Sequence, residues 1–133
     1  MPFSVEGQKL SHLNKEGLES FLFVHGLGAS KNSFDSCVTM KAFGDYGIVS
    51  IDLPGCGHSC PLDDFSYTME DQANLVYSRI ATHKFTDIIL VGHSMGGVIC
   101  LYLAEALGGR VKAFFNLEGN LGFEDCTYSR KIA

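Results

Sequence analysis

The stretch Ile88-Ile89-Leu90-Val91-Gly92-His93-Ser94-Met95-Gly96-Gly97 decides the fold of this chain. Four apolar residues lead into a Gly-x-Ser-x-Gly motif, and an apolar segment typical of a helix follows it. This motif, the nucleophile elbow, presents a serine on a strained turn between a strand and a helix. Its glycines leave room where the strand and the helix nearly touch. We therefore interpret Ser94 as a nucleophile; the alternative is an ordinary serine in a glycine-rich turn.

Strand-like apolar segments alternate with helical patterns along the chain, which predicts parallel strands joined by crossover helices. We expect an early, partly exposed strand at 9–14 and buried strands at 21–24, 48–51, 88–91 and 111–117. One helix is expected at 33–43, capped by Ser33, and a second opens after its cap Thr68, with Met69, Ala73, Val76 and Ile80 on its apolar face. A third is expected at 97–107, ended by Gly108 and Gly109; it is apolar almost all round and should lie buried against the sheet. Residues 1–133 thus form a single predicted α/β domain.

The composition limits the classes of partner. The chain has 46% hydrophobic and 19% charged residues, as soluble globular domains do, and a formal net charge of −5. No basic run favours nucleic acid or an anionic membrane, the N-terminal residues lack the pattern of a secretory signal, and no apolar run reaches bilayer length. We expect a cytoplasmic protein that acts on a small-molecule substrate, without nucleic acid or membrane partners.

Five cysteines form an odd set without a Cys-x-x-Cys pair, which favours free thiols over a disulfide framework. Cys56, His58 and Cys60 lie close together in the sequence and could begin a metal site. A zinc site usually draws further ligands from a second spaced pair, and the sequence offers none. We therefore expect loop thiols here, with no metal and no cofactor.

Three motifs follow predicted strands in a characteristic order. They are Phe23-Val24-His25-Gly26-Leu27-Gly28, Asp52-Leu53-Pro54-Gly55-Cys56-Gly57-His58-Ser59 and Gly92-His93-Ser94-Met95-Gly96-Gly97. In these motifs the chain resembles the α/β-hydrolase fold family over about residues 8–120. The resemblance implies a mostly parallel sheet with crossover helices, forming the N-terminal part of that fold. It also implies hydrolysis of the serine esterase or lipase type.

The resemblance assigns roles to the motif residues. Ser94 would be the nucleophile, and the backbone N–H groups of Leu27 and Met95 would form the oxyanion hole, the pair of donors that stabilises charge on a tetrahedral intermediate. His25 and Gly26 would shape that hole and contribute to binding rather than transfer a proton. Asp52 matches a loop residue whose role in the family is mainly structural.

The general base and the acid are less well defined. In the family the histidine comes from a loop after the last strand of the sheet, and no matching Gly-His segment exists in this sequence. His93 should point away from the side chain of Ser94, its neighbour in sequence, and His58 could approach only by rearrangement. Either one is a working base or a structural or solvated residue. Glu118 is the candidate acid, at a variant family position after the strand that ends at Leu117; otherwise it lines the pocket or anchors the loop.

We therefore expect a chain truncated after the sixth strand of the family fold, with a tail from Phe123 that begins a lid region. The expected reaction is hydrolysis of an ester-type small molecule through an acyl-enzyme, with little or no activity in this chain, and esterases, thioesterases and C–C hydrolases remain open. The alternative is a non-catalytic fragment or binding module. The strand 111–117 should be an exposed edge that invites self-association, unless the tail from Phe123 covers it.

Overall fold

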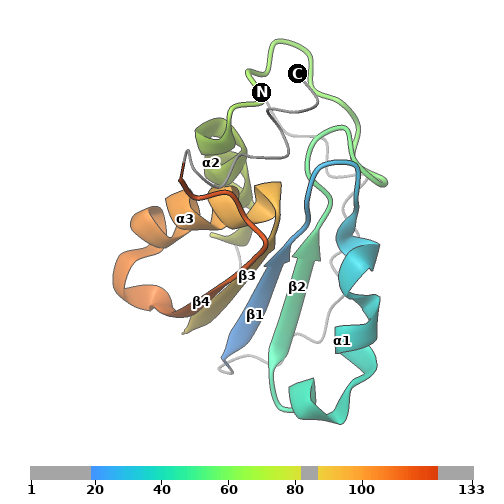
Figure 1. The fold of residues 1–133 in the computed structure, drawn as a ribbon, viewed down its shortest axis with the longest axis vertical. Coiled ribbons are helices and arrows are strands. Elements are labelled where there is room, and N and C mark those ends of the chain that lie inside the picture. Colours follow the sequence, from blue (N-terminus) through green and yellow to red (C-terminus); the bar gives the residue numbers. More distant parts are fainter. Residues whose placement is uncertain (1–18, 82–86, 123–133) are drawn as a thin grey trace.

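The sheet has the predicted parallel arrangement. A computed structural model describes residues 19–81 and 87–122 of the chain. Its strands are β1 (Ser20–Val24), β2 (Gly47–Ile51), β3 (Ile88–His93) and β4 (Val111–Leu117), all parallel, in the spatial order β2-β1-β3-β4 (Figure 1). The α/β fold class is confirmed. The strand predicted at 9–14 and the tail from Phe123 lie outside the described residues.

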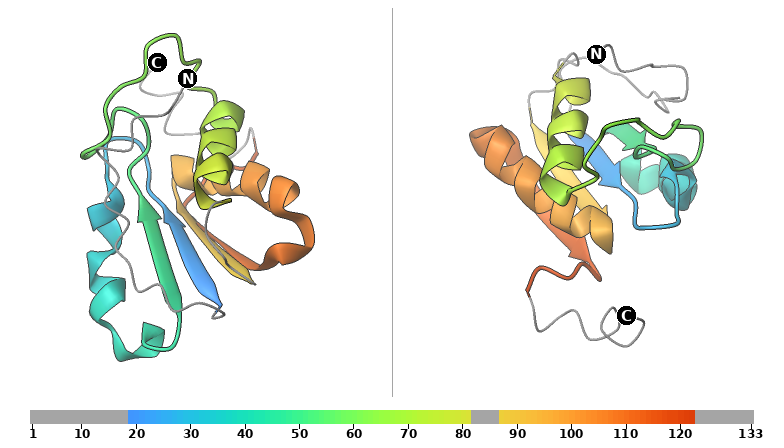
Figure 2. Two further views of the ribbon diagram at one scale, coloured as in Figure 1. Left: turned by 180° about the vertical axis from the view of Figure 1, so that it is seen from behind. Right: turned by 90° about the horizontal axis from the view of Figure 1, so that it is seen from above.

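Helices cover both faces of the sheet. On one face lie α2 (Met69–Ile80) and α3 (Met95–Leu107), and on the other lie α1 (Asp35–Thr39) and two short 3-10 turns, η1 (Lys31–Phe34) and η2 (Lys41–Phe43) (Figure 2). Successive strand residues point to opposite faces. Leu22 and Val24 of β1 therefore pack with α2 and α3, whereas Phe23 packs against Phe34 of η1. No helix among the described residues is long and apolar enough to span a bilayer.

The helix predicted at 33–43 is wrong in its boundaries and its cap. Ser30, not Ser33, accepts a hydrogen bond from the N–H of Asn32 (3.3 Å), and the segment divides into η1, α1 and η2. Met40 has extended backbone angles (φ −72°, ψ 132°), which end α1. The early start follows from Lys31, whose backbone and side chain are both bound to a buried carboxylate, that of Asp52.

The helix expected after Thr68 is confirmed as α2. The Thr68 hydroxyl oxygen accepts a hydrogen bond from the N–H of Asp71 (3.1 Å), as a helix cap does. Ala73, Val76 and Ile80 are buried on its apolar face. Gln72 is also buried and donates a hydrogen bond to the carbonyl oxygen of Tyr67 (3.0 Å), so a polar residue completes this face.

The helix expected at 97–107 begins two residues earlier, as α3, and ends at Gly108 (φ 55°). It lies against the sheet as expected, with one face buried, formed by Ile99, Cys100, Leu103 and Leu107. Leu101 and Tyr102 point to solvent among the described residues. A single sheet and α2 contact this helix, so the opposite side has no cover there.

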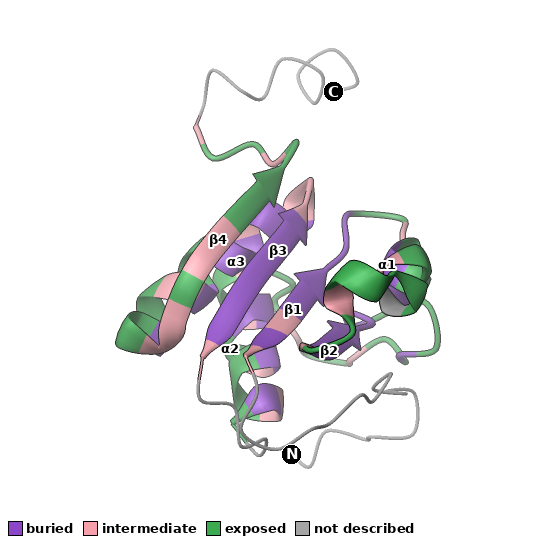
Figure 3. Ribbon diagram, turned by 90° about the horizontal axis from the view of Figure 1, so that it is seen from below, coloured by how far each residue is buried: buried purple, intermediate pink, exposed green. Residues whose placement is uncertain are grey.

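The strand expected to be buried at 111–117 is only half-buried. Among the described residues, β4 pairs with β3 alone, which confirms that it forms an edge of the sheet. Lys112 has no partner in the β3 register, because a bulge at this point shifts the pairing from Val111 to Ala113. Figure 3 shows β4 as the outermost strand, exposed or half-buried along its length.

Two leucines on α3 test this account of the core. Leu103 is fully buried, whereas Leu101, two residues away, is 45% exposed. Leu103→Ala should lower the free energy of unfolding by about 2–5 kcal/mol, because it leaves a cavity between helix and sheet. Leu101→Ala is the matched control and should change it by less than about 0.5 kcal/mol. Urea denaturation followed by circular dichroism measures both; equal effects would contradict the burial pattern of α3.

Candidate functional site

Ser94 lies in the turn that joins β3 to α3. Its backbone is left-handed (φ 52°, ψ −120°), a conformation that non-glycine residues rarely adopt. Hydrogen bonds hold this turn on both sides. The N–H of Ser94 donates to the carbonyl oxygen of Leu117 in β4 (2.8 Å), and the Ser94 carbonyl accepts from Gly97 (2.9 Å). A strained serine is therefore fixed between a strand and a helix.

The glycines around Ser94 are required by space. A Cβ on Gly92 would lie 2.4 Å from the carbonyl oxygen of Gly96, and one on Gly96 would lie 2.1 Å from that of Val24. Both contacts are with backbone atoms, which cannot move aside as a flexible side chain can. The first turn of α3 therefore sits directly against the ends of β3 and β1, as the motif predicted.

The turn after β1 adjoins Ser94. A Cβ on Gly26 would lie 3.0 Å from Cβ of Ser94 and 3.3 Å from Nδ1 of His93. The side chains of Ser94 and His93 therefore both lie next to Gly26. Leu27 follows Gly26 and is exposed, so its backbone lies at the rim of the same turn.

His25 is a buried structural residue. Its Nδ1–H donates to the carbonyl oxygen of Gly26 (2.8 Å), and its Nε2 accepts from the N–H of Leu53 (3.0 Å). Burial lowers the pKa of His25, although the bond to Gly26 opposes this shift. The ring is therefore neutral with both nitrogens occupied, and it joins the turn after β1 to the loop after β2.

Asp52 anchors the loop after β2. Its fully buried carboxylate accepts hydrogen bonds from the backbone N–H of Lys31 (2.8 Å), from Lys31 Nζ (2.6 Å) and from the N–H of His58 (3.0 Å). Burial alone raises the pKa of Asp52, but these hydrogen bonds outweigh it and hold the pKa below its usual value. Asp52 is thus ionised and structural. His58 contacts Lys31 Nζ (3.2 Å), on the side of this loop.

The end of β4 packs against the Ser94 turn through Asn116, a residue that the sequence analysis missed. Its amide nitrogen donates to the carbonyl oxygen of Gly119 (3.1 Å). A Cβ added to Gly97 would lie 2.1 Å from the amide oxygen of Asn116, and one added to Gly119 would lie 2.0 Å from it, so neither position has room for a side chain. The sequence held one signal of this contact. Gly97 follows Gly96 although the Gly-x-Ser-x-Gly motif requires only Gly96, which indicates a further close approach at Gly97.

Glu118 lies beside His93 rather than in contact with Ser94. Its Oε2 is 3.3 Å from Nε2 of His93, and its side chain is 85% exposed. Glu118 itself has a left-handed backbone (φ 58°), so the residue that follows β4 is strained, as Ser94 is. The contacts given above for His25, His58 and His93, the histidines within the described residues, do not include Ser94.

Within 19–81 and 87–122, no group of three or more His, Cys, Asp and Glu side chains could hold a metal ion. The cysteines described there, including Cys56 and Cys60, are unpaired. Cys56 is partly buried, and this burial raises the pKa of its thiol.

Sequence comparison adds the family to this geometry. A profile of the alpha/beta hydrolase fold matches residues 19–130. The chain belongs to this family. It is 34% identical over 104 residues to the uncharacterized hydrolase YugF of Bacillus subtilis, covering 77% of this chain and 38% of that protein. It is 29% identical over 96 residues to 2-succinyl-6-hydroxy-2,4-cyclohexadiene-1-carboxylate synthase of Escherichia coli, covering 71% of this chain and 36% of the enzyme.

Solved structures of other proteins share the fold. A lipase-esterase related protein of Clostridium acetobutylicum superposes with a TM-score of 0.65 at 29% identity, over 85% of this chain and 47% of that one. A marine microorganism esterase gives a TM-score of 0.70 at 22% identity, over 82% and 40%. The chain thus spans less than half the length of each of these relatives.

Gly96 and Gly109 offer a matched test of the close approach at Ser94. An added Cβ at Gly96 would overlap the backbone of β1, whereas one at Gly109 meets no atom within 4 Å. Gly96→Ala should lower the free energy of unfolding by about 2 kcal/mol or more. Gly109→Ala should leave it within about 1 kcal/mol of the original value. Thermal or urea unfolding distinguishes the two, and a harmless Gly96→Ala would contradict the packing described here.

Asp52 should make stability depend on pH. Because its native pKa is lowered, it stabilises the fold above its unfolded-state pKa of about 4, and the effect is lost as the pH falls through the native pKa. Asp52→Asn should therefore cost about 3 kcal/mol at pH 7 and progressively less as the solution is acidified. Urea titrations at neutral and acidic pH measure the difference. The exposed Asp63→Asn is the control, with no such pH-dependent loss expected.

Proposed function

We propose that Ser94 is the nucleophile of a hydrolase that cleaves an ester-type small molecule through an acyl-enzyme. One observation carries the proposal: Ser94 has a strained backbone and lies next to the turn after β1. A Cβ added to Gly26 in that turn would be only 3.0 Å from the Cβ of Ser94. A serine hydroxyl in such a turn is presented to solvent-borne substrate at the ends of parallel strands, where this class of sheet binds its ligands.

The backbone N–H groups of Leu27 and Met95 are the proposed oxyanion hole. Met95 is the first residue of α3, so its N–H belongs to the unpaired set at a helix start. Leu27 directly follows Gly26, which adjoins Ser94. Two such donors aimed at a developing oxyanion each contribute about 3 kcal/mol to lowering the barrier. His25, Gly26 and His93 border this place and would shape it.

The proposed mechanism assigns no group that accepts the proton of the Ser94 hydroxyl. His25 is buried and fully hydrogen-bonded, and His58 belongs to the Asp52 loop. His93 has its Nε2 beside Glu118, which keeps Glu118 as a candidate acid or as an anchor of the loop after β4. A serine without a base reacts slowly, because nucleophile and base act as a unit. We infer that residues 1–133 hydrolyse esters at close to the background rate.

Among the relatives, names such as lipase-esterase related protein and marine microorganism esterase favour ester substrates. A thioesterase domain from the curacin biosynthetic pathway also shares the fold, with a TM-score of 0.71 at 22% identity. We therefore propose the ester class and leave its acyl and alcohol parts unassigned. A non-catalytic scaffold that binds a partner is the second candidate, favoured by the absence of a described histidine in contact with Ser94.

A fluorophosphonate probe tests the proposed nucleophile. Ser94 should be labelled slowly and selectively, as mapped by peptide mass spectrometry, and Ser94→Ala should abolish the labelling. The exposed Ser36→Ala is the matched control and should leave it unchanged. Turnover of a short p-nitrophenyl ester by the same samples should stay near background. Absence of labelling at long times would contradict the nucleophile, and rapid labelling would show that the chain supplies a base.

A further inference from the structure

The turn after β1, residues 26–30, carries Leu27, whose backbone N–H is a proposed donor of the oxyanion hole. The side chain of Leu27 is 82% exposed, so it contributes little packing that could fix the turn. A backbone hydrogen bond closes the turn, from the N–H of Ala29 to the carbonyl oxygen of Gly26 (3.2 Å). An oxyanion donor must be held to within a fraction of an ångström. The position of this turn therefore depends on how its two ends are fixed.

Both ends of the turn are bound to the same short segment of the loop after β2. At the first end, Nε2 of His25 accepts a hydrogen bond from the N–H of Leu53 (3.0 Å). At the second end, the N–H of Lys31 donates to Oδ1 of Asp52 (2.8 Å). Asp52 and Leu53 are consecutive residues, so the two attachments converge. Residues 52–53 thus set the place of the whole turn.

Lys31 is bound through its backbone and its side chain. Its carbonyl oxygen accepts a hydrogen bond from Oγ of Ser50 in β2 (3.2 Å), and its Nζ donates to Oδ2 of Asp52 (2.6 Å). The side chain of Lys31 is 7% exposed and that of Asp52 is 0% exposed. A buried ion pair adds little net stability compared with apolar residues of similar volume, so stability alone does not account for it. Its short, directional bonds fix the geometry of the chain around it.

We propose that the buried pair of Lys31 and Asp52 positions the backbone N–H of Leu27 in the oxyanion hole. This inference rests on the proposed function of Ser94 as a nucleophile. One carboxylate binds both the backbone and the ammonium group of Lys31, so the ammonium group fixes the orientation of the carboxylate that holds the end of the turn. Lys31 and Asp52 act through the turn and are positioning residues. Because Gly26 adjoins Ser94, any shift of the turn moves Leu27 relative to the nucleophile.

A double variant tests this role without leaving a buried charge unpaired. Lys31→Met alone would isolate the Asp52 carboxylate in the interior, which is strongly destabilising. Combining it with Asp52→Asn removes both charges and keeps a side-chain oxygen for the backbone N–H of residue 31. We expect this double variant to fold, as measured by circular dichroism and urea denaturation.

The measurement is the rate at which a fluorophosphonate labels Ser94 over a range of probe concentrations. The maximal rate should fall about 10–100-fold in the double variant, because a misplaced donor no longer stabilises the charge of the transition state. The probe concentration that gives half this rate should stay unchanged, since oxyanion donors act on the transition state rather than on probe binding.

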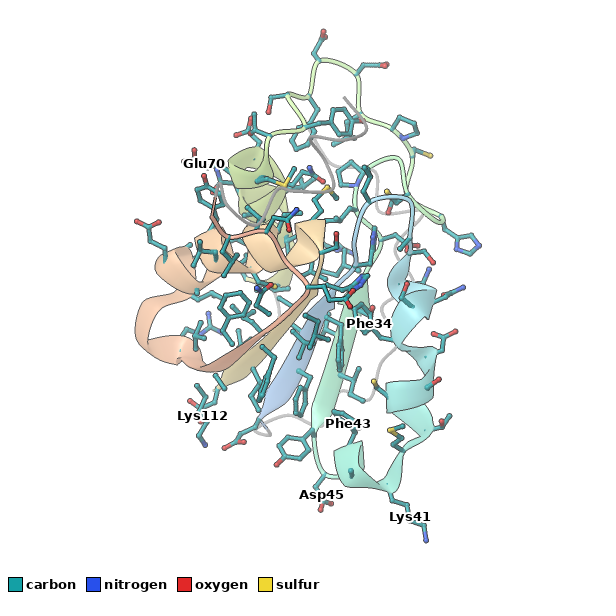
Figure 4. The ribbon with its side chains drawn as sticks, in the orientation of Figure 1. Phe34, Lys41, Phe43, Asp45, Glu70 and Lys112 are labelled. Atoms are coloured by element: carbon teal, nitrogen blue, oxygen red, sulfur yellow. The ribbon has the colours of Figure 1, made fainter. Side chains whose placement is uncertain are left out.

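Two controls separate positioning from general destabilisation. Lys41→Met changes an exposed lysine that extends away from the sheet (Figure 4) and should leave both quantities unchanged. Ile80→Ala removes a buried side chain of α2 and lowers stability without touching the turn. Its folded molecules should be labelled at the wild-type rate.

The outcomes distinguish this inference from the proposed function. A wild-type maximal rate in the double variant, or an equal loss of rate in Ile80→Ala, would overturn the positioning role while labelling of Ser94 still supports the nucleophile. A wild-type chain in which Ser94 is not labelled at all would overturn the nucleophile, and the positioning role with it.

Discussion

The close approach of α3 to the ends of β1 and β3 is the constraint on which the rest of the structure depends. Gly92 and Gly96 permit it, since any side chain at either position would overlap backbone atoms. Once the helix starts there, the backbone of Ser94 must be left-handed, and its N–H reaches β4. The reactive position is thus a product of main-chain packing, and the side chains around it mainly secure that packing.

Two polar centres secure the loops around this contact. His25 joins the turn after β1 to Leu53, and Asp52 joins the loop after β2 to Lys31 and His58. Both groups are buried, and both have their hydrogen-bonding atoms occupied, which is the condition under which buried polar groups rigidify a structure. The turn after β1, which adjoins Ser94, and the loop after β2 are therefore tied to each other by buried polar groups.

Sequence reasoning succeeded where a residue determines the conformation of the backbone next to it. The glycines around Ser94 and the cap Thr68 act on neighbouring backbone, so their spacing predicts β3, the turn and the start of α2. It failed where a distant residue decides the local structure. Lys31 starts its turn early because Asp52, far along the chain, binds it, and no helical period reports that bond. The contact between Asn116 and Gly97 is likewise a tertiary contact, and no local sequence pattern predicts it.

The strand order has a consequence for how the molecule forms. Central β1 pairs with β3, whose residues follow it by 68 positions (Ser20 with Ile88), and all pairs in the sheet are parallel. Contacts so far apart in sequence close slowly, because the chain between them must lose its freedom first. Gly96 rests on the carbonyl of Val24, so the turn at Ser94 can take its shape only after β1 and β3 have met. We therefore expect the strained turn at Ser94 to form late in folding, because it depends on contacts between β1 and the start of α3.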